Sequence, residues 1–214
     1  MLLIIPTIFS SQIQAQVPVS EEPYHRPVFQ NKYIRLLDVW LRPGDTTQFH
    51  IHKIPSLFVY LSNTINASQI KGEEWVKGRS AAGGLWYRSF SPDTLVHRVA
   101  NVDSDIFHVN DIEILSTYDT TNRPIKPLPF PVLFENDKSF AYQLSNKNIN
   151  GKIIKSRGPL IAELATGDRV MFTDTKTFHS RGIKTGQYFY IEPGTSFYFS
   201  AATGNIKMIV FEIK

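Results

Sequence analysis

The chain of 214 residues contains no cysteine, which excludes disulfides, thiolate metal ligands and a cysteine nucleophile. Lysine and arginine occur singly rather than in runs and the net charge is only +4, so we expect no nucleic-acid partner. A glycine-rich phosphate loop, a GxSxG elbow, a DxDxDG calcium loop and a heptad pattern are also missing. The composition is that of a globular protein, and its 15 Phe and 9 Tyr favour strands.

The beginning of the sequence carries no charged side chain before Glu21. Residues 2–9 form a short apolar run, a polar stretch follows, and Ala15 is a small residue suited to cleavage. This pattern predicts a signal peptide over residues 1–15, too short for a membrane span, and therefore an exported, periplasmic or extracellular protein. The alternative is an apolar N-terminal segment, loose or packed on the protein. Residues 16–30, including His25, are predicted to form an N-terminal arm.

From Lys32 onward, short apolar runs alternate with clusters of Pro, Gly, Asn and Asp, without a helical period. This spacing predicts an all-β sandwich or barrel. The pattern occurs twice, because residues 31–118 and 137–214 share five features in the same order at an offset of about 100 to 106 residues. Residues 119–136 are the predicted linker. A chance similarity between two β segments is the alternative.

Two histidine-bearing stretches carry the candidate chemistry. His50 and His52 are two residues apart, so on a strand they share one face at a separation of about 6.5 to 7 Å. A later run would present His97, Val99 and Asn101 on one face of another strand. Three neutral imidazoles from two neighbouring strands could hold one metal ion and leave other positions open to water or substrate.

These stretches resemble the two conserved motifs of the cupin superfamily. The residues at matching spacings are Gly44, His50, His52, Pro92, His97 and Asn101. The resemblance covers about residues 30–116, with a fainter second copy in 137–214. It implies a double-stranded β-helix, or jelly-roll barrel, duplicated as a compact bicupin. It also implies one divalent transition metal (Fe, Mn, Zn or Ni) on His50, His52 and His97.

The sequence departs from the family pattern in two places. Ser56 stands where the family has a glutamate ligand, with Leu57 as the other possible position, and Thr94 replaces a glycine of the second motif. What remains resembles the three-histidine sites of thiol dioxygenases and β-diketone-cleaving cupins. A carboxylate could still come from elsewhere, with Glu73 and Glu74 as candidates.

The second copy lacks the histidines. The repeat places Ile154, Ser156 and Tyr198 where the first copy has its three ligands, so we expect a degenerate module. Its one histidine, His179, falls in a predicted turn.

Other residues near the predicted site have supporting roles. Tyr60 and Arg88 are candidate catalytic residues, since their strands should flank the site and an arginine binds a carboxylate through two donors. Gln48 and Asn101 are candidate cofactor-binding residues on the faces of the histidines. His108 is expected to be a half-buried histidine with its own partner.

The sequence leaves three functions open. The first is a metal-dependent enzyme acting on a small organic molecule: a three-histidine dioxygenase, a lyase or an isomerase. The second is a non-enzymatic module that binds a metal, a sugar or another small ligand. The third is a structural protein with a vestigial site, or a histidine cluster without metal. The resemblance also implies a homodimer.

Overall fold

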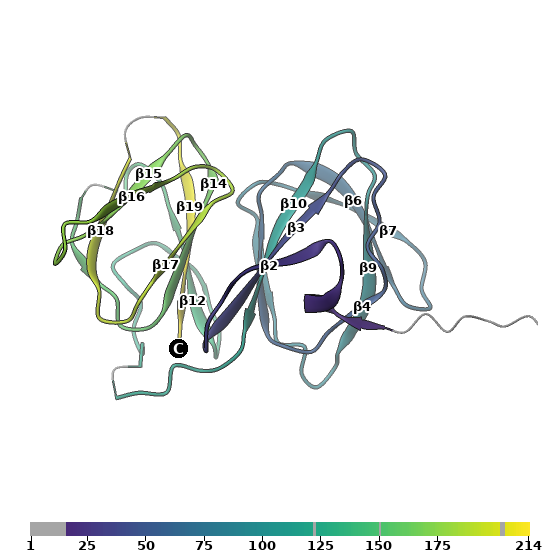
Figure 1. Cartoon of the computed structure of the whole chain (residues 1–214), viewed down its shortest axis with the longest axis horizontal. Coiled ribbons are helices and arrows are strands. Elements are labelled where there is room, and N and C mark those ends of the chain that lie inside the picture. Colours follow the sequence, from purple (N-terminus) through teal and green to yellow (C-terminus); the bar gives the residue numbers. More distant parts are fainter. Residues whose placement is uncertain (1–15, 122, 150, 202–203) are drawn as a thin grey trace, which may run out of the picture.

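The computed structural model describes residues 16–121, 123–149, 151–201 and 204–214 (Figure 1). The predicted signal peptide, residues 1–15, lies outside the described residues. Within the described part, one 3₁₀ turn (Val19–Glu21) is the only helical element and strands make up the rest of the regular structure. The described residues contain no helix long and apolar enough to cross a membrane.

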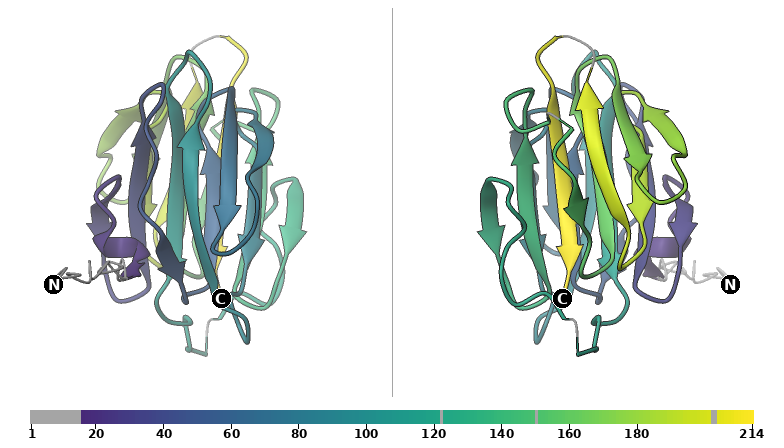
Figure 2. Two further views of the ribbon diagram at one scale, coloured as in Figure 1. Left: turned by 90° about the vertical axis from the view of Figure 1, so that its right-hand side faces the viewer. Right: turned by 90° about the vertical axis from the view of Figure 1, so that its left-hand side faces the viewer.

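The first barrel is formed by two five-stranded sheets. Its strands are β1 (Val17–Pro18), β2 (His25–Gln30), β3 (Ile34–Leu41), β4 (His50–His52), β5 (Ser56–Tyr60), β6 (Thr64–Ile70), β7 (Val76–Ser80), β8 (Leu85–Arg88), β9 (Leu95–Asn101) and β10 (Phe107–Ile114). One sheet has the order β1-β4-β9-β6-β7 and the other the order β2-β3-β10-β5-β8. The chain crosses repeatedly between the two sheets, which is the double-stranded β-helix that the motifs predict (Figures 1 and 2).

The second barrel repeats this topology. Its strands are β11 (Val132–Glu135), β12 (Ser139–Leu144), β13 (Ile154–Lys155), β14 (Leu160–Thr166), β15 (Val170–Asp174), β16 (Ser180–Ile183), β17 (Tyr188–Ile191), β18 (Ser196–Ala201) and β19 (Lys207–Ile213). The order β11-β12-β19-β14-β17 matches β2-β3-β10-β5-β8, and β13-β18-β15-β16 matches β4-β9-β6-β7. The predicted all-β jelly roll, duplicated as a bicupin, is confirmed.

The pairing register aligns the two barrels residue by residue. His50 lies opposite His97, and Ile154 lies opposite Phe197. The equivalent of His97 is therefore Phe197, and not Tyr198 as the sequence spacing suggests. The difference is one residue, which on a strand moves a side chain to the other face. Phe197 points into the second barrel and is fully buried.

The barrels pack through one sheet of each, as Figure 1 shows. The shared core contains Leu36, Leu57 and Ile112 from the first barrel and Ile161 and Phe211 from the second, all fully buried. Every residue of β10 is buried, because its even-numbered apolar positions face this core and its odd-numbered positions face the interior of the first barrel. The second barrel therefore supports the sheet that forms one wall of the first barrel's cavity.

Candidate metal centre

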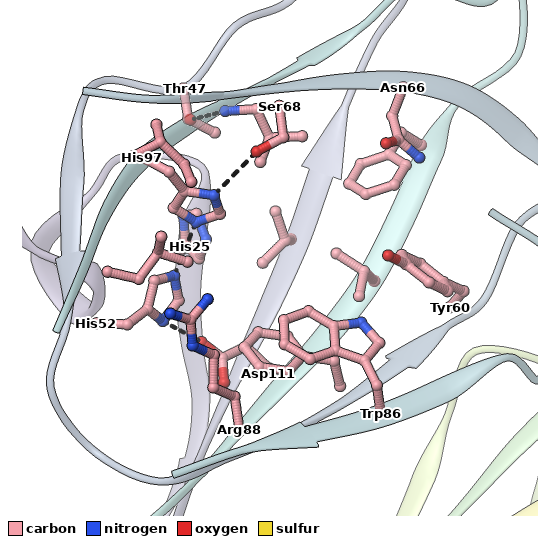
Figure 3. A pocket seen from close by; sticks show the side chains of 17 residues that line it. His25, Thr47, His52, Tyr60, Asn66, Ser68, Trp86, Arg88, His97 and Asp111 are labelled. Carbon is pink, nitrogen blue, oxygen red and sulfur yellow. Dashed lines mark hydrogen bonds and ion pairs between the residues drawn. The ribbon is translucent and has the colours of Figure 1, made fainter. Parts of the chain in front are cut away.

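The three predicted ligands meet inside the first barrel. His50 and His52 come from β4, and His97 lies directly opposite His50 on β9. Ring centroids are 5.0 Å apart for His50 and His52, 4.6 Å for His50 and His97, and 5.0 Å for His52 and His97. The Nε2 atoms of His52 and His97 are 3.1 Å apart. The two strands thus bring the three imidazoles to one place (Figure 3).

A fourth imidazole, His25, joins this cluster. His25 was predicted to lie in an N-terminal arm, but the arm folds onto the barrel and buries the residue. Its ring centroid is 4.5 Å from that of His50 and 6.3 Å from that of His52. One ligand atom from each of His25, His50 and His52 lies within 4.8 Å of the other two. The only sequence signal was the nearby Glu22, three residues earlier, with which His25 pairs.

Hydrogen bonds on the outer side of three rings fix their orientation. The Nδ1 atom of His50 donates to the carbonyl oxygen of Gln48 at 2.9 Å. The Nδ1 atom of His97 lies 3.2 Å from Ser68 Oγ, and that of His25 lies 2.6 Å from Glu22 Oε2. Metal-binding histidines usually hold their second nitrogen in this way, which leaves the other nitrogen for the metal.

Burial keeps these imidazoles neutral. It lowers the pKa of His50 to about 4, and the positive charge that His25 can carry lowers it further. Burial, followed by the neighbouring His50, lowers the pKa of His97 to about 3. The pKa of His52 is lowered as well, by burial and then by His97. Neutral imidazoles at neutral pH have lone pairs available for a metal ion.

One buried carboxyl group lies beside the cluster. Asp111 on β10 is 1% exposed, and neither of its oxygens has a hydrogen-bond partner among the described residues. Its Oδ2 is 3.5 Å from His52 Nδ1, which is longer than a normal hydrogen bond. Burial, reinforced by Glu113, raises the pKa of Asp111 well above its usual range. Glu73 and Glu74, the carboxylates considered from sequence, are exposed beyond the end of β6.

The cluster lies at the edge of a cavity of about 260 Å³. Tyr60 and Arg88, the candidate catalytic residues, line it together with Trp86, whose ring stacks on Phe58 with centroids 3.8 Å apart (Figure 3). The remaining wall is mostly apolar: Val39, Leu95, Val99, Phe107 and Val109. Such a cavity suits a small, largely apolar molecule oriented by a few polar groups.

Two candidate residues lie elsewhere. The side chain of Gln48 is exposed, and Gln48 supports the cluster through its backbone alone. Asn101 is buried, but its amide group donates to the carbonyl oxygens of Leu41 and Asp105 and so holds a turn. Neither lines the cavity.

The two remaining histidines lie outside the cluster, and His108 is more deeply buried than predicted. His108 lies 2.8 Å from a carboxylate oxygen of Asp38, on the opposite face of β10 from Asp111. His179 is exposed in the turn between β15 and β16.

Comparison with known proteins places the fold. No family model and no curated protein matches the chain. AerE from Microcystis aeruginosa superposes with a TM-score of 0.59 at 12% identity, covering 90% of this chain and 98% of that one. A cupin 2 conserved barrel domain protein from Leptotrichia buccalis gives 0.57 at 11%, covering 88% of both chains. Salicylate 1,2-dioxygenase from Pseudoaminobacter salicylatoxidans, solved as gentisate adducts, gives a TM-score of 0.58 at 10% identity. The match covers 86% of this chain and 70% of that one.

Identities this low establish the fold alone. The chain has the cupin fold, in its duplicated form. Within that fold, three buried histidines of the first barrel, His25, His50 and His52, could hold a metal ion.

The residues present fit a transition metal. His50 Nε2 is buried without a hydrogen-bond partner among the described residues, so a lone pair there has no protein group to satisfy it. The histidines offer imidazole nitrogens, a donor type that suits Fe, Ni or Zn better than Mn, which prefers carboxylate oxygens.

Proposed function

We propose that the first barrel binds one divalent transition metal on His50, His52 and His97, and that the protein oxygenates a small organic molecule there. The observation that carries this proposal is the convergence of neutral, hydrogen-bonded imidazoles at one edge of an apolar cavity. When bound, the metal supplies a Lewis acid and, as Fe(II), a centre that reacts with dioxygen. A structural neighbour that is a salicylate 1,2-dioxygenase supports this reaction class by analogy of fold.

The residues of the chain provide the binding and orientation. The stacked rings of Phe58 and Trp86 form a flat wall against which a planar molecule can lie. Arg88 is exposed at the cavity, with its guanidinium carbon 5.2 Å from the centroid of Phe90, and can bind a substrate carboxylate. Tyr60 offers a hydroxyl group on the side of Trp86 away from Arg88 (Figure 3).

Elemental analysis of the protein, purified without added metal, tests the metal site. We expect close to one transition metal per chain, and loss of that metal in His50→Ala and in His97→Ala. The exposed His179→Ala is the matched control and should keep the metal. Metal retained in both site variants, or no binding even after incubation with Fe(II), Ni(II) or Zn(II), would exclude this site.

Oxygen consumption by the Fe(II)-loaded protein tests the reaction. A panel of thiols, diketones and small carboxylates is suitable, and we expect turnover with at least one member that His97→Ala lacks. Saturable binding of panel members without oxygen uptake would instead support the alternative, a non-enzymatic small-ligand-binding cupin. Export and homodimer formation stay predictions from the sequence and the resemblance.

A further inference from the structure

The N-terminal arm is part of the barrel at the site, since it pairs with a barrel strand and buries side chains there. β1 pairs in parallel with β4, so that Val17 lies beside His50 and Pro18 beside Ile51. Val19 is buried at the start of the 3₁₀ turn, and Glu22 and His25 follow it into the barrel. The strand that bears two of the metal ligands is therefore held in place by the arm.

We propose that His25 is a fourth protein ligand of the metal, positioned by Glu22, so that metal binding and docking of the arm are coupled. This inference rests on the metal site proposed above. It differs from it in assigning a ligand that lies outside both histidine motifs, and in making the arm part of the metal centre.

Glu22 is the residue that connects the arm to the cluster. Its side chain is fully buried, and it holds His25 Nδ1 at 2.6 Å. The same carboxylate accepts hydrogen bonds from the backbone N–H groups of Tyr24 at 2.8 Å and of Gln48 at 3.0 Å. Gln48 in turn accepts the Nδ1–H of His50. A single carboxylate thus orients His25 directly and His50 through the backbone of one residue, Gln48.

This arrangement has the form of a carboxylate–histidine–metal triad, in which the carboxylate fixes the orientation of the imidazole ring. Because Glu22 uses Nδ1, the free nitrogen of His25 is Nε2, and the ligand atoms of His25, His50 and His52 are already within 4.8 Å of each other. A structural Glu–His pair would satisfy both residues equally well, but it would not require the ring to lie against His50. The 4.5 Å separation between these two ring centroids favours the ligand role.

A fourth nitrogen changes what the metal can do. A four-coordinate ion such as Zn²⁺ would be saturated by four imidazoles and would have no position for substrate. A six-coordinate ion such as Fe(II) or Ni(II) would keep two positions, enough for a chelating substrate or for substrate and a second small molecule. The cluster therefore favours a six-coordinate metal.

Metal titration of variants tests this assignment. With Fe(II) or Co(II) in competition with a chelator, His25→Ala should weaken binding about ten- to hundredfold or more, and Glu22→Gln by about tenfold. The neighbouring Glu21 is exposed, so Glu21→Gln is the matched control and should bind as the wild type does. In the Co(II) protein, His25→Ala should also change the visible absorption bands, because one nitrogen donor is lost.

Proteolysis of the arm provides a measurement on the unmodified protein. We expect bound metal to slow cleavage within residues 17–25 of the wild type at least tenfold, and to have no such effect in His25→Ala. Unchanged affinity and an unchanged Co(II) spectrum in His25→Ala would overturn the inference, as would equal cleavage with and without metal in the wild type. If His50→Ala loses the metal while His25→Ala keeps it, the proposed function stands and only this inference fails.

Discussion

The two barrels share one topology but fill their interiors with opposite chemistry. In the first barrel, equivalent positions hold Ser68, Trp86, His97 and Val99, and in the second they hold Phe172, Phe189, Phe197 and Phe199. His50 corresponds to Ile154 in the same register. The four phenylalanine rings contact one another, with centroids 5.1 to 6.3 Å apart. The fold thus accepts either a packed aromatic core or a cavity edged by histidines, and the side chains decide which.

The two barrels also differ in the strand that each contributes to the contact between them, β10 in the first and β19 in the second. Asp111 on β10 corresponds to Val210 on β19 in the pairing register. Val210 belongs to a closed apolar core, whereas Asp111 is a buried carboxyl group without a hydrogen-bond partner among the described residues. Such a group destabilises the folded state unless it serves another purpose. At this position the first barrel therefore carries a buried polar group where the second has an apolar side chain.

Truncation of the second core should give the largest change in stability. Phe197→Ala removes a fully buried ring, and we expect the free energy of unfolding to fall by about 3 to 5 kcal/mol. Metal content, measured by elemental analysis, should stay at the wild-type level. Phe178→Ala, at an exposed position, is the control and should leave stability unchanged. Loss of metal by a folded Phe197→Ala protein would show that metal binding in the first barrel depends on the core of the second barrel.

Acidification should destabilise the metal-free protein through the first barrel. The folded-state pKa of His50 is about 4 and its ordinary value is 6.5, so between these values the unfolded chain binds a proton that the folded chain does not. The unfolding free energy should therefore fall as pH falls from 6.5 to 4, by about 3 kcal/mol for this residue. Urea unfolding at several pH values measures the slope.

A variant sharpens this pH prediction. His50→Ile introduces the residue that the second barrel holds at this position, and the slope should become shallower. An identical slope in the variant and the wild type would show that His50 is not the source of the pH dependence.

Replacement of Asp111 by its counterpart should stabilise the metal-free protein. Asp111→Val removes a buried, unpartnered carboxyl group, and we expect the free energy of unfolding to rise by about 1 to 3 kcal/mol in urea titrations. Glu113→Val, two residues along the same face, is the contrasting control. Glu113 is buried and paired with Arg35, so its removal should destabilise the protein. A loss of stability in Asp111→Val would mean that the carboxyl group has a stabilising partner.

The smallest expected effect concerns the outer partner of His97. Ser68→Ala removes the hydroxyl group next to His97 Nδ1, and metal affinity should fall by about tenfold. The equivalent residue, Phe172, is partly buried against the aromatic core of the second barrel. Thermal unfolding of the metal-free variant should be close to that of the wild type, and an unchanged metal affinity would argue against a role for Ser68 in orienting the ring.

The sequence predicted the parts of the site that depend on local spacing. His50 and His52 share a face because strand side chains alternate, and the duplicated order of turns predicted two barrels. His25 and Asp111 were missed because their positions depend on the pairing of strands: β2, which His25 begins, lies beside β3, and β10 lies between β3 and β5. No sequence spacing encodes those contacts.

Gln48 and Asn101, the two candidates that do not line the cavity, were misplaced for a related reason. Gln48 has the parity of His50, but β4 begins at His50, so the alternation does not extend back to Gln48. Asn101 has the parity of His97, but it ends β9, where its amide group is used by the following turn. Alternation predicts side-chain direction only within a strand, and strand ends are the least certain feature of a sequence-based prediction.

The double burial of β10 has a consequence for how this protein can change. Adjacent residues of this strand serve different neighbours, Asp111 the histidines and Ile112 the other barrel. A one-residue insertion or deletion that shifted the strand would exchange them, placing an isoleucine beside His52 and a carboxyl group against the apolar residues of the other barrel. We therefore expect length variation in related chains to be confined to the loops on either side of β10, while its eight positions vary by substitution alone.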